Sequence, residues 1–190
     1  MTATPPDRLP FTGDPEADAL IARDPLAMLV GFVLDQQVPV QKAFAGPHEL
    51  SRRIGGLDAA RIAAMDPEAL AAAFRAKPAL HRFPGAMAAR VGELCTVIAT
   101  DYGGDAARVW ADVGDGKELI DRLRALPGIG ETKAGTIAVI LARRYGVRPP
   151  GWEDVLPWHP TLGDVVTPED LARYQAEKRA HKAAARAARG

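Results

Sequence analysis

Apolar residues recur along most of the chain at spacings of three and four, the period that places side chains on one face of an α-helix. The pattern predicts helices over residues 25–34, 42–54, 57–65, 67–74, 86–102, 119–126 and 132–145. The segment 25–34 is apolar nearly all round, which indicates a helix buried in the core. Runs of β-branched and aromatic residues, which are typical of strands, are scarce. The sequence therefore predicts an all-α fold.

The two ends of the chain differ from its middle. Residues 1–15 contain four prolines and few apolar residues, which predicts an extended N-terminal arm. The run Thr167-Pro168-Glu169-Asp170 is a helix-capping sequence, and it predicts a C-terminal basic helix or tail over 167–190. We therefore expect one main domain over 16–166 between these two segments.

The charge of the chain is balanced overall but uneven along it. The chain has 24 basic and 24 acidic residues, which weighs mildly against a nucleic-acid partner. The segment 173–190, however, holds six basic residues and only one acidic residue, Glu177. Basic charge is thus concentrated near the C-terminus.

The single cysteine, Cys95, excludes an intrachain disulfide, a four-thiolate iron–sulfur cluster and a four-thiolate zinc site. No apolar run approaches the roughly 20 residues that a membrane span needs, and the polar N-terminus lacks the apolar core of a signal peptide. We therefore expect a cytoplasmic monomer without a metal or a membrane partner.

The most informative segment is Leu126-Pro127-Gly128-Ile129-Gly130, which lies between two helical stripes. Two glycines two positions apart allow a tight turn and a close approach of the backbone to a ligand. Gly130 also precedes a helix, whose first turn leaves N–H groups unpaired and suited to an anion such as phosphate. Ile129 is expected to point inward between the helices. The alternative is an ordinary helical connection with glycine at a helix C-terminus, but the preceding Leu-Pro and the flanking helices favour a DNA-binding hairpin.

On these residues the chain resembles the helix-hairpin-helix superfamily of DNA glycosylases over roughly residues 24–146. Residues 33–38, Val-Leu-Asp-Gln-Gln-Val, are similar to the family segment at the end of an early buried helix, and residues 83–91 loosely resemble the opening of the long helix before the hairpin. The resemblance implies two helical lobes with a cleft for a base flipped out of duplex DNA. It also implies that Gln37, beside Gln36, fills the gap in the duplex. Residues 128–130, with Thr132 and Lys133, would then hold the phosphates.

The chain departs from the family at its nucleophile. Bifunctional members have a lysine two residues after the second hairpin glycine, where this chain has Thr132, and Lys133 follows one residue later. One residue on a helix is a rotation of about 100°, so Lys133 is expected to contact phosphate or solvent rather than act as the nucleophile. This favours a monofunctional enzyme that uses water, with Lys133 catalytic only if the enzyme is a lyase.

The family's catalytic aspartate also lacks a clear counterpart. Asp154 is the nearest candidate by spacing, and Glu153 and Asp164 are the other candidates. For each of the three, the alternative is a surface carboxylate or a helix cap without a catalytic role. Trp152, Trp158 and His159 are candidates to line a base pocket or simply to pack an irregular segment.

The resemblance thus predicts a DNA glycosylase that hydrolyses the N-glycosidic bond of a damaged or mispaired base. A non-catalytic protein that binds DNA or recognises damage through the hairpin is the alternative. We expect no cofactor, with at most a monovalent cation at the hairpin carbonyls. A helical interaction domain unrelated to DNA remains the third possibility, and it would show no salt-dependent binding to duplex DNA.

Overall fold

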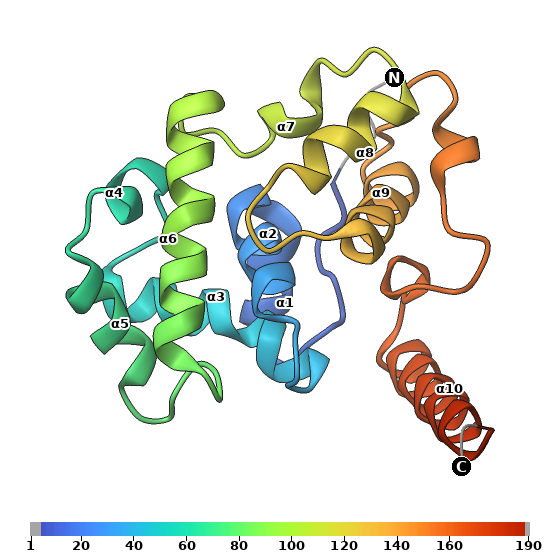
Figure 1. The fold of residues 1–190 in the computed structure, drawn as a ribbon, viewed down its shortest axis with the longest axis horizontal. Helices are drawn as coiled ribbons and strands as arrows, with labels where there is room; N and C mark the ends of the chain where they lie inside the picture. Colours follow the sequence, from blue (N-terminus) through green and yellow to red (C-terminus); the bar gives the residue numbers. More distant parts are fainter. Residues whose placement is uncertain (1–4, 189–190) are drawn as a thin grey trace.

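The computed structural model describes residues 5–188, which form helices joined by short loops, with no strand in this range (Figure 1). The α-helices are α1 (Pro15–Arg23), α2 (Pro25–Leu34), α3 (Val40–Ile54), α4 (Ala59–Ala63), α5 (Pro67–Arg75), α6 (Pro84–Asp101), α7 (Arg108–Ala111), α8 (Gly116–Arg124), α9 (Glu131–Arg144) and α10 (Pro168–Ala187). Two short 3₁₀ helices, η1 (Trp152–Val155) and η2 (Leu162–Asp164), lie between α9 and α10. The all-α prediction is confirmed.

Helix α2 lies at the centre of the fold, and each of its residues from Leu26 to Leu34 is buried. Phe44 of α3 packs edge-on against Phe32 of α2, with ring centroids 5.0 Å apart. A Cβ on Gly31 would lie 2.5 Å from the Phe44 ring, so glycine at this position allows the two helices to approach this closely. The nearly uniform apolar character of 25–34 is thus explained by burial on all sides.

The described part of the predicted N-terminal arm, residues 5–14, is non-helical but packs on the core. Leu9 and Phe11 are buried, and the Phe11 ring lies 5.1 Å from that of Phe44. The Asp18 carboxylate of α1 accepts hydrogen bonds from the Phe11 and Thr12 backbone N–H groups. This segment covers the core rather than extending from it, and residues 1–4 lie outside the described range.

Helix boundaries follow the predicted capping signals closely. Asp24 caps α2 by accepting from the Leu26 and Ala27 N–H groups, and Pro25 occupies the first helical position. Thr167 and Asp170 form the predicted capping box at the start of α10. The pattern did not predict α1 or α7, and the helix expected over 57–65 is limited to α4.

The hairpin between α8 and α9 lies against α2 and α6. A Cβ on Gly128 would lie 3.1 Å from Val33 of α2 and 3.2 Å from Arg90 of α6, and Ile129 is buried. Helix α6 packs on α4 and α5 on its other side, whereas α9 packs on α8 and η2. The end of α2, the start of α6 and the hairpin therefore meet at one place.

Within residues 5–188, none of the helices combines the length and the apolar character that crossing a membrane requires.

Candidate functional site

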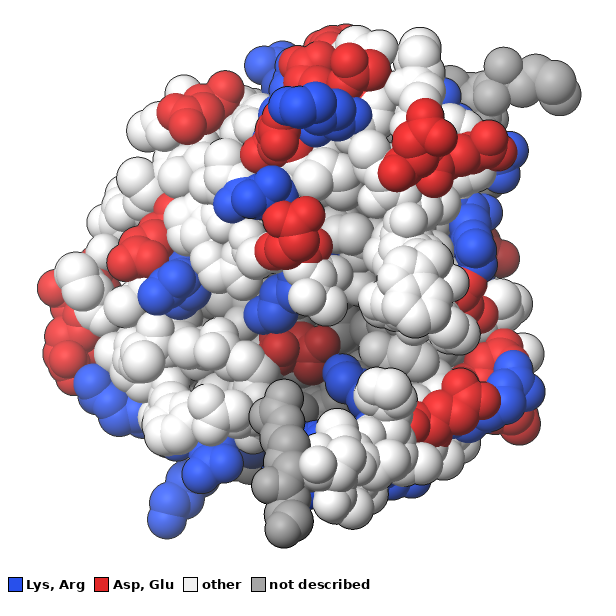
Figure 2. Space-filling model, turned by 45° about the vertical axis from the view of Figure 1, so that its right-hand side comes forward, with Lys and Arg blue, Asp and Glu red and all other residues white. Residues whose placement is uncertain are grey.

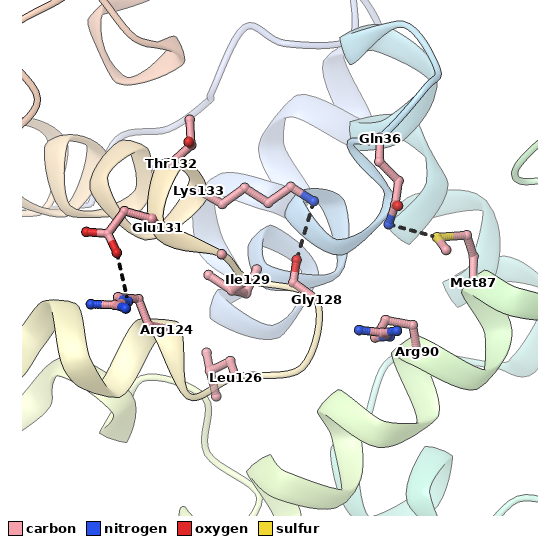
Figure 3. Close-up of a pocket in the computed structure, with 11 residues that line it drawn as sticks. Gln36, Met87, Arg90, Arg124, Leu126, Gly128, Ile129, Glu131, Thr132 and Lys133 are labelled. Carbon is pink, nitrogen blue, oxygen red and sulfur yellow. Dashed lines mark hydrogen bonds and ion pairs between the residues drawn. The ribbon is translucent and has the colours of Figure 1, made fainter.

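A pocket of ≈ 640 Å³ lies where the hairpin, α6 and the loop after α2 meet (Figure 3). Its lining combines backbone from the hairpin with polar side chains from all three elements. The lining residues are Gln36, Met87, Arg90, Arg124, Leu126, Gly128, Ile129, Gly130, Glu131, Thr132 and Lys133. The structure thus brings together six of the seven predicted DNA-binding residues, and the seventh, Gln37, follows Gln36 directly in the chain.

The structure requires glycine at one of the two hairpin positions but not at the other. Gly128 has φ +82°, in the left-handed region that favours glycine, and it packs tightly against Val33 and Arg90. Gly130 has φ −90°, which any residue adopts, and its Cβ would meet nothing within 4 Å. Neither the backbone nor the packing of the described chain therefore requires glycine at 130. An external group that approaches the backbone closely would require it.

Gly130 is also the N-cap of α9, and no side chain caps this helix. The N–H groups of the first turn of a helix are unpaired within the helix and lie at the positive end of its dipole. Because Gly130 and Glu131 line the pocket, this end of α9 is open to a ligand. Together with the open space at Gly130, the uncapped helix start forms a surface suited to an anion.

The loop after α2 is held rigidly on the opposite side of the pocket. The Gln36 Nε2 donates to the Val33 carbonyl oxygen at 3.1 Å and contacts the Met87 sulfur at 3.3 Å. The Phe83 N–H donates to Nδ1 of buried His81. This hydrogen bond leaves Nε2 of His81 as the donor to the Gln36 carbonyl oxygen, at 2.9 Å. His81 thus positions the backbone of the Gln36-Gln37 turn.

Gln37 lies at the tip of this loop with φ +56°, the one positive φ among the described non-glycine residues. A left-handed conformation costs a non-glycine residue about 1–2 kcal/mol. The Gln37 side chain is exposed, so burial does not repay this cost. A strained and exposed polar residue beside a pocket is a functional candidate.

Lys133 points into the pocket rather than away from it (Figure 3). Its Nζ donates one long hydrogen bond, 3.4 Å, to the Gly128 carbonyl oxygen. Burial lowers the pKa of the Lys133 amine, while the charge of Asp35 opposes this shift and that of Arg90 adds to it. The rotation expected to turn Lys133 away from the site does not exclude it, because Thr132 and Lys133 both line the pocket at the start of α9.

Asp35 is the residue that the sequence analysis did not single out. It follows the last residue of α2, where the negative end of the helix dipole disfavours a carboxylate. Its side chain makes no hydrogen bond or ion pair with another described residue. Burial raises the pKa of the Asp35 carboxyl, and the charges of Lys178 and Lys133 partly offset the rise. The sequence signal that could have identified Asp35 is its position directly after an apolar helix. A carboxylate at the C-terminal end of a helix does not stabilise that helix, so another reason for its presence is expected.

The carboxylates predicted from the sequence lie elsewhere. Glu153 and Asp154 are exposed on η1, which packs on the first turn of α8, where the Gly116 N–H donates to the Pro150 carbonyl oxygen at 2.8 Å. The hairpin follows the other end of α8, about 13 Å away along a nine-residue helix. Neither residue lines the pocket.

Asp164 is likewise distant from the pocket. Its carboxylate accepts from the Thr161 N–H at 2.7 Å and pairs with Arg143 in the last turn of α9. The hairpin precedes the first turn of that 14-residue helix, about 20 Å away. Asp164 therefore stabilises the η2 segment.

The predicted aromatic candidates also lie outside the pocket lining. Trp152 is half-buried under the guanidinium of Arg148, 5.2 Å from the ring centroid. Trp158 is 95% exposed, and its ring makes an edge contact with His159 at 5.5 Å. Trp152 thus packs its segment, whereas Trp158 has little packing role.

The described residues contain no group of three or more His, Cys, Asp or Glu side chains suited to a metal ion. Cys95 is buried, and burial raises the pKa of its thiol to about 12, which makes it unreactive. The polar side chains that line the pocket are those of Gln36, Thr132, Lys133, Arg90, Arg124 and Glu131. Asp35 and Gln37 flank Gln36 in the chain, and the charge of Asp35 acts on Lys133.

Basic and acidic side chains are mixed over the surface that Figure 2 shows, and an acidic group lies in a hollow near its centre with basic groups beside it. Comparison of the chain with known proteins finds no matching protein-family model, and no curated protein is significantly similar to it.

Proposed function

We propose that this chain binds duplex DNA at the hairpin and hydrolyses the N-glycosidic bond of a damaged or mispaired base. The observation that supports the proposal is that the hairpin, the start of α9 and the loop after α2 meet at one pocket. The uncapped start of α9 with its open Gly130 suits a phosphate, and the strained Gln37 suits a group inserted into the duplex. Asp35, two residues before Gln37, is half-buried and acts electrostatically on Lys133. The pocket lies between the hairpin on one side and the α2–α3 loop on the other, as a cleft between two helical lobes would.

The proposed chemistry needs a negative charge near the sugar of a flipped nucleotide. The C1′–N bond breaks with its electron pair leaving to the base, and positive charge develops on the sugar. A water oxygen then bonds to C1′ and loses a proton to solvent, while the departed base gains one. We assign the stabilising carboxylate to Asp35, because a fixed charge in a poorly solvated site stabilises an oxocarbenium-like transition state strongly.

The test is base release from duplexes that each carry one lesion or mismatch, with and without alkali, comparing wild type, Asp35→Asn and Asp154→Asn. Asp35→Asn removes a poorly solvated charge without removing a hydrogen bond, so it is expected to fold. We expect alkali-dependent strand cleavage by the wild type, loss of base release in Asp35→Asn, and normal release in Asp154→Asn. Loss in Asp154→Asn alone would overturn the assignment.

A second candidate, a lyase, is favoured by the position of Lys133. A half-buried amine with a lowered pKa is a better nucleophile than a solvated one. Its nitrogen would bond to C1′ as the base leaves with the electron pair of the C1′–N bond. The C1′–O4′ bond of the sugar ring would then open, with O4′ taking up a proton, and loss of the amine protons would give an imine that borohydride reduces to a stable amine. A borohydride-trapped complex that Lys133→Gln abolishes would establish the lyase. Salt-dependent duplex binding with no base release from any substrate would instead establish a non-catalytic recognition protein.

A further inference from the structure

The basic and acidic residues of this chain are separated along its length. Residues 1–177 hold 19 of the 24 basic residues and all 24 acidic residues, a formal charge of −5. Residues 178–190 hold the other five basic residues and none that is acidic. A body of net negative charge is a poor match for DNA, because neutralisation of phosphates supplies much of the affinity. The positive charge that residues 1–177 lack is supplied by residues 178–190, in α10 and directly after it.

Helix α10 is anchored to the body only over its first half. Leu171 is buried, and Gln175 exchanges amide hydrogen bonds with Gln41 of α3 at 3.1 and 2.9 Å. Every residue from Ala176 to Ala187 is exposed, and the helix projects from the body (Figure 1). Its alanine-rich sequence gives it high intrinsic helix propensity. The second half of α10 is therefore an exposed arm, in which Lys178 lies over the Tyr174 ring of the same helix, 5.6 Å from its centroid.

The basic residues of this arm lie on one side of it. Lys178, Lys182 and Arg186 follow one another at spacings of four, and Arg179 lies three residues before Lys182. Lys178 is itself three residues after Gln175, so the stripe begins beside the face that contacts α3. The charge of Lys178 also acts on Asp35, which directly precedes the pocket residue Gln36 in the chain.

We propose that Lys178, Lys182 and Arg186 form a phosphate-binding arm that holds duplex DNA beside the stretch bound by the hairpin. The eight-residue span from Lys178 to Arg186 rises about 12 Å. Duplex DNA carries three or four phosphates per strand over about 12 Å of its axis. Long, flexible cationic side chains at this spacing suit the backbone and carry no base specificity. The inference rests on the proposed function, since it names a second contact with the same partner.

The experiment measures the affinity of full-length protein for an undamaged duplex of about 30 base pairs as a function of salt concentration. The arm variant is Lys178→Gln/Lys182→Gln/Arg186→Gln, in which glutamine keeps the helix propensity. The control variant, Arg52→Gln/Arg75→Gln/Lys117→Gln, removes the same charge from exposed residues of α3, α5 and α8 that already pair with acidic neighbours. Circular dichroism of both variants checks that the helices remain.

We expect the slope of log K against log salt to become shallower by about two to three in the arm variant, at about 0.9 per lost phosphate contact. The control variant should keep the wild-type slope. Equal slopes in the two variants would overturn the arm while leaving base release by the wild type, and hence the proposed function, intact. Absence of salt-dependent binding in the wild type would overturn both.

Discussion

Asp35, directly after α2, and Lys133, in the first turn of α9, lie within electrostatic range of each other and form no ion pair in the described structure. Each side chain is half-buried, and burial favours its neutral form. It raises the pKa of the Asp35 carboxyl and lowers the pKa of the Lys133 amine. The charge of each group favours the ionised form of the other and so opposes the effect of burial. Under the proposed function, the Asp35 carboxylate would stabilise positive charge that develops on the sugar.

The proposed role of Asp35 predicts the pH dependence of base release. The ionised form is the active one, so the rate should fall as the pH falls through a pKa above the ordinary aspartate value. Lys178 and Lys133 lower this pKa by their charge, and Arg90 acts on Lys133. Lys178→Gln removes one favourable charge, so the acidic limb of the pH–rate profile should move to higher pH. An unchanged limb in this variant would show that another group titrates.

Asp35 also predicts a pH-dependent effect on folding. Because its pKa is raised in the folded protein, ionisation of Asp35 destabilises the fold. Asp35→Asn should therefore increase the free energy of unfolding above the folded pKa, and the gain should vanish below the unfolded value, near 3.8. Urea unfolding of the wild type and of Asp35→Asn at neutral and at acidic pH measures the gain and its disappearance. A variant that is less stable at neutral pH would indicate a structural role for the carboxylate.

The two hairpin glycines predict opposite mutational effects. Gly128→Ala forces alanine into φ +82° against Val33 and Arg90, and we expect a loss of about 1–2 kcal/mol in stability. Gly130→Ala meets no atom within 4 Å, so its effect on stability should be only about 0.5 kcal/mol. Its Cβ nevertheless stands where a phosphate would approach, and duplex affinity should fall at least about tenfold, or 1.4 kcal/mol. Denaturation and binding measured on the same two variants separate these effects, and normal affinity in Gly130→Ala would contradict the phosphate site.

Capping signals and helical periodicity predicted most of the fold, because local interactions determine where these helices begin. Asp24-Pro25 and Thr167 with Asp170 are examples that act within one turn. Helix α1 begins with the same signal, Asp14-Pro15, yet the prolines before it favoured an extended arm. The burial of Phe11 depends on its contact with Phe44 of α3, which no local pattern describes.

The candidate site was predictable only in part. The hairpin and the Gln36-Gln37 pair have a local signature, so the sequence could single them out, and the hairpin and Gln36 line one pocket in the structure. The choice of carboxylate depends instead on distance in space. Asp154 is close to α9 in sequence, but η1 packs at the far end of α8, whereas Asp35 is about a hundred residues from Lys133 and lies near it. Sequence spacing after α9 could not reveal this.

Substitutions of Gln37 separate the effect of its strained backbone on stability from the effect of its side chain on activity. Gln37→Gly relieves the left-handed conformation, so stability should be unchanged or higher by up to about 1 kcal/mol. It also removes the side chain proposed to enter the duplex, so base release from a paired substrate should slow much more than release from single-stranded DNA. Gln37→Ala should lose the same activity without gaining stability. Equal rates for wild type and Gln37→Gly on duplex substrate would rule out the inserted side chain.

Glu131 predicts a gain in DNA affinity. It lies at the first position of α9 and pairs with Arg124 across the hairpin at 3.0 Å, and both residues are largely exposed and line the pocket. Glu131→Gln removes a negative charge beside the proposed phosphate and frees Arg124. We expect tighter duplex binding and a salt slope steeper by up to about 0.9. The variant should also lose about 0.3–1 kcal/mol of stability, because Glu131 interacts favourably with the helix dipole.

The matched control for this prediction is Glu68→Gln, which breaks a similar exposed pair with Arg75 on α5, away from the pocket. Both variants gain one unit of charge, so a general electrostatic effect would strengthen binding in both. A stronger effect in Glu131→Gln would place the phosphate at the start of α9. Weaker binding in Glu131→Gln would mean that the carboxylate itself accepts a hydrogen bond from the nucleic acid, and the phosphate would then have to bind elsewhere on the hairpin.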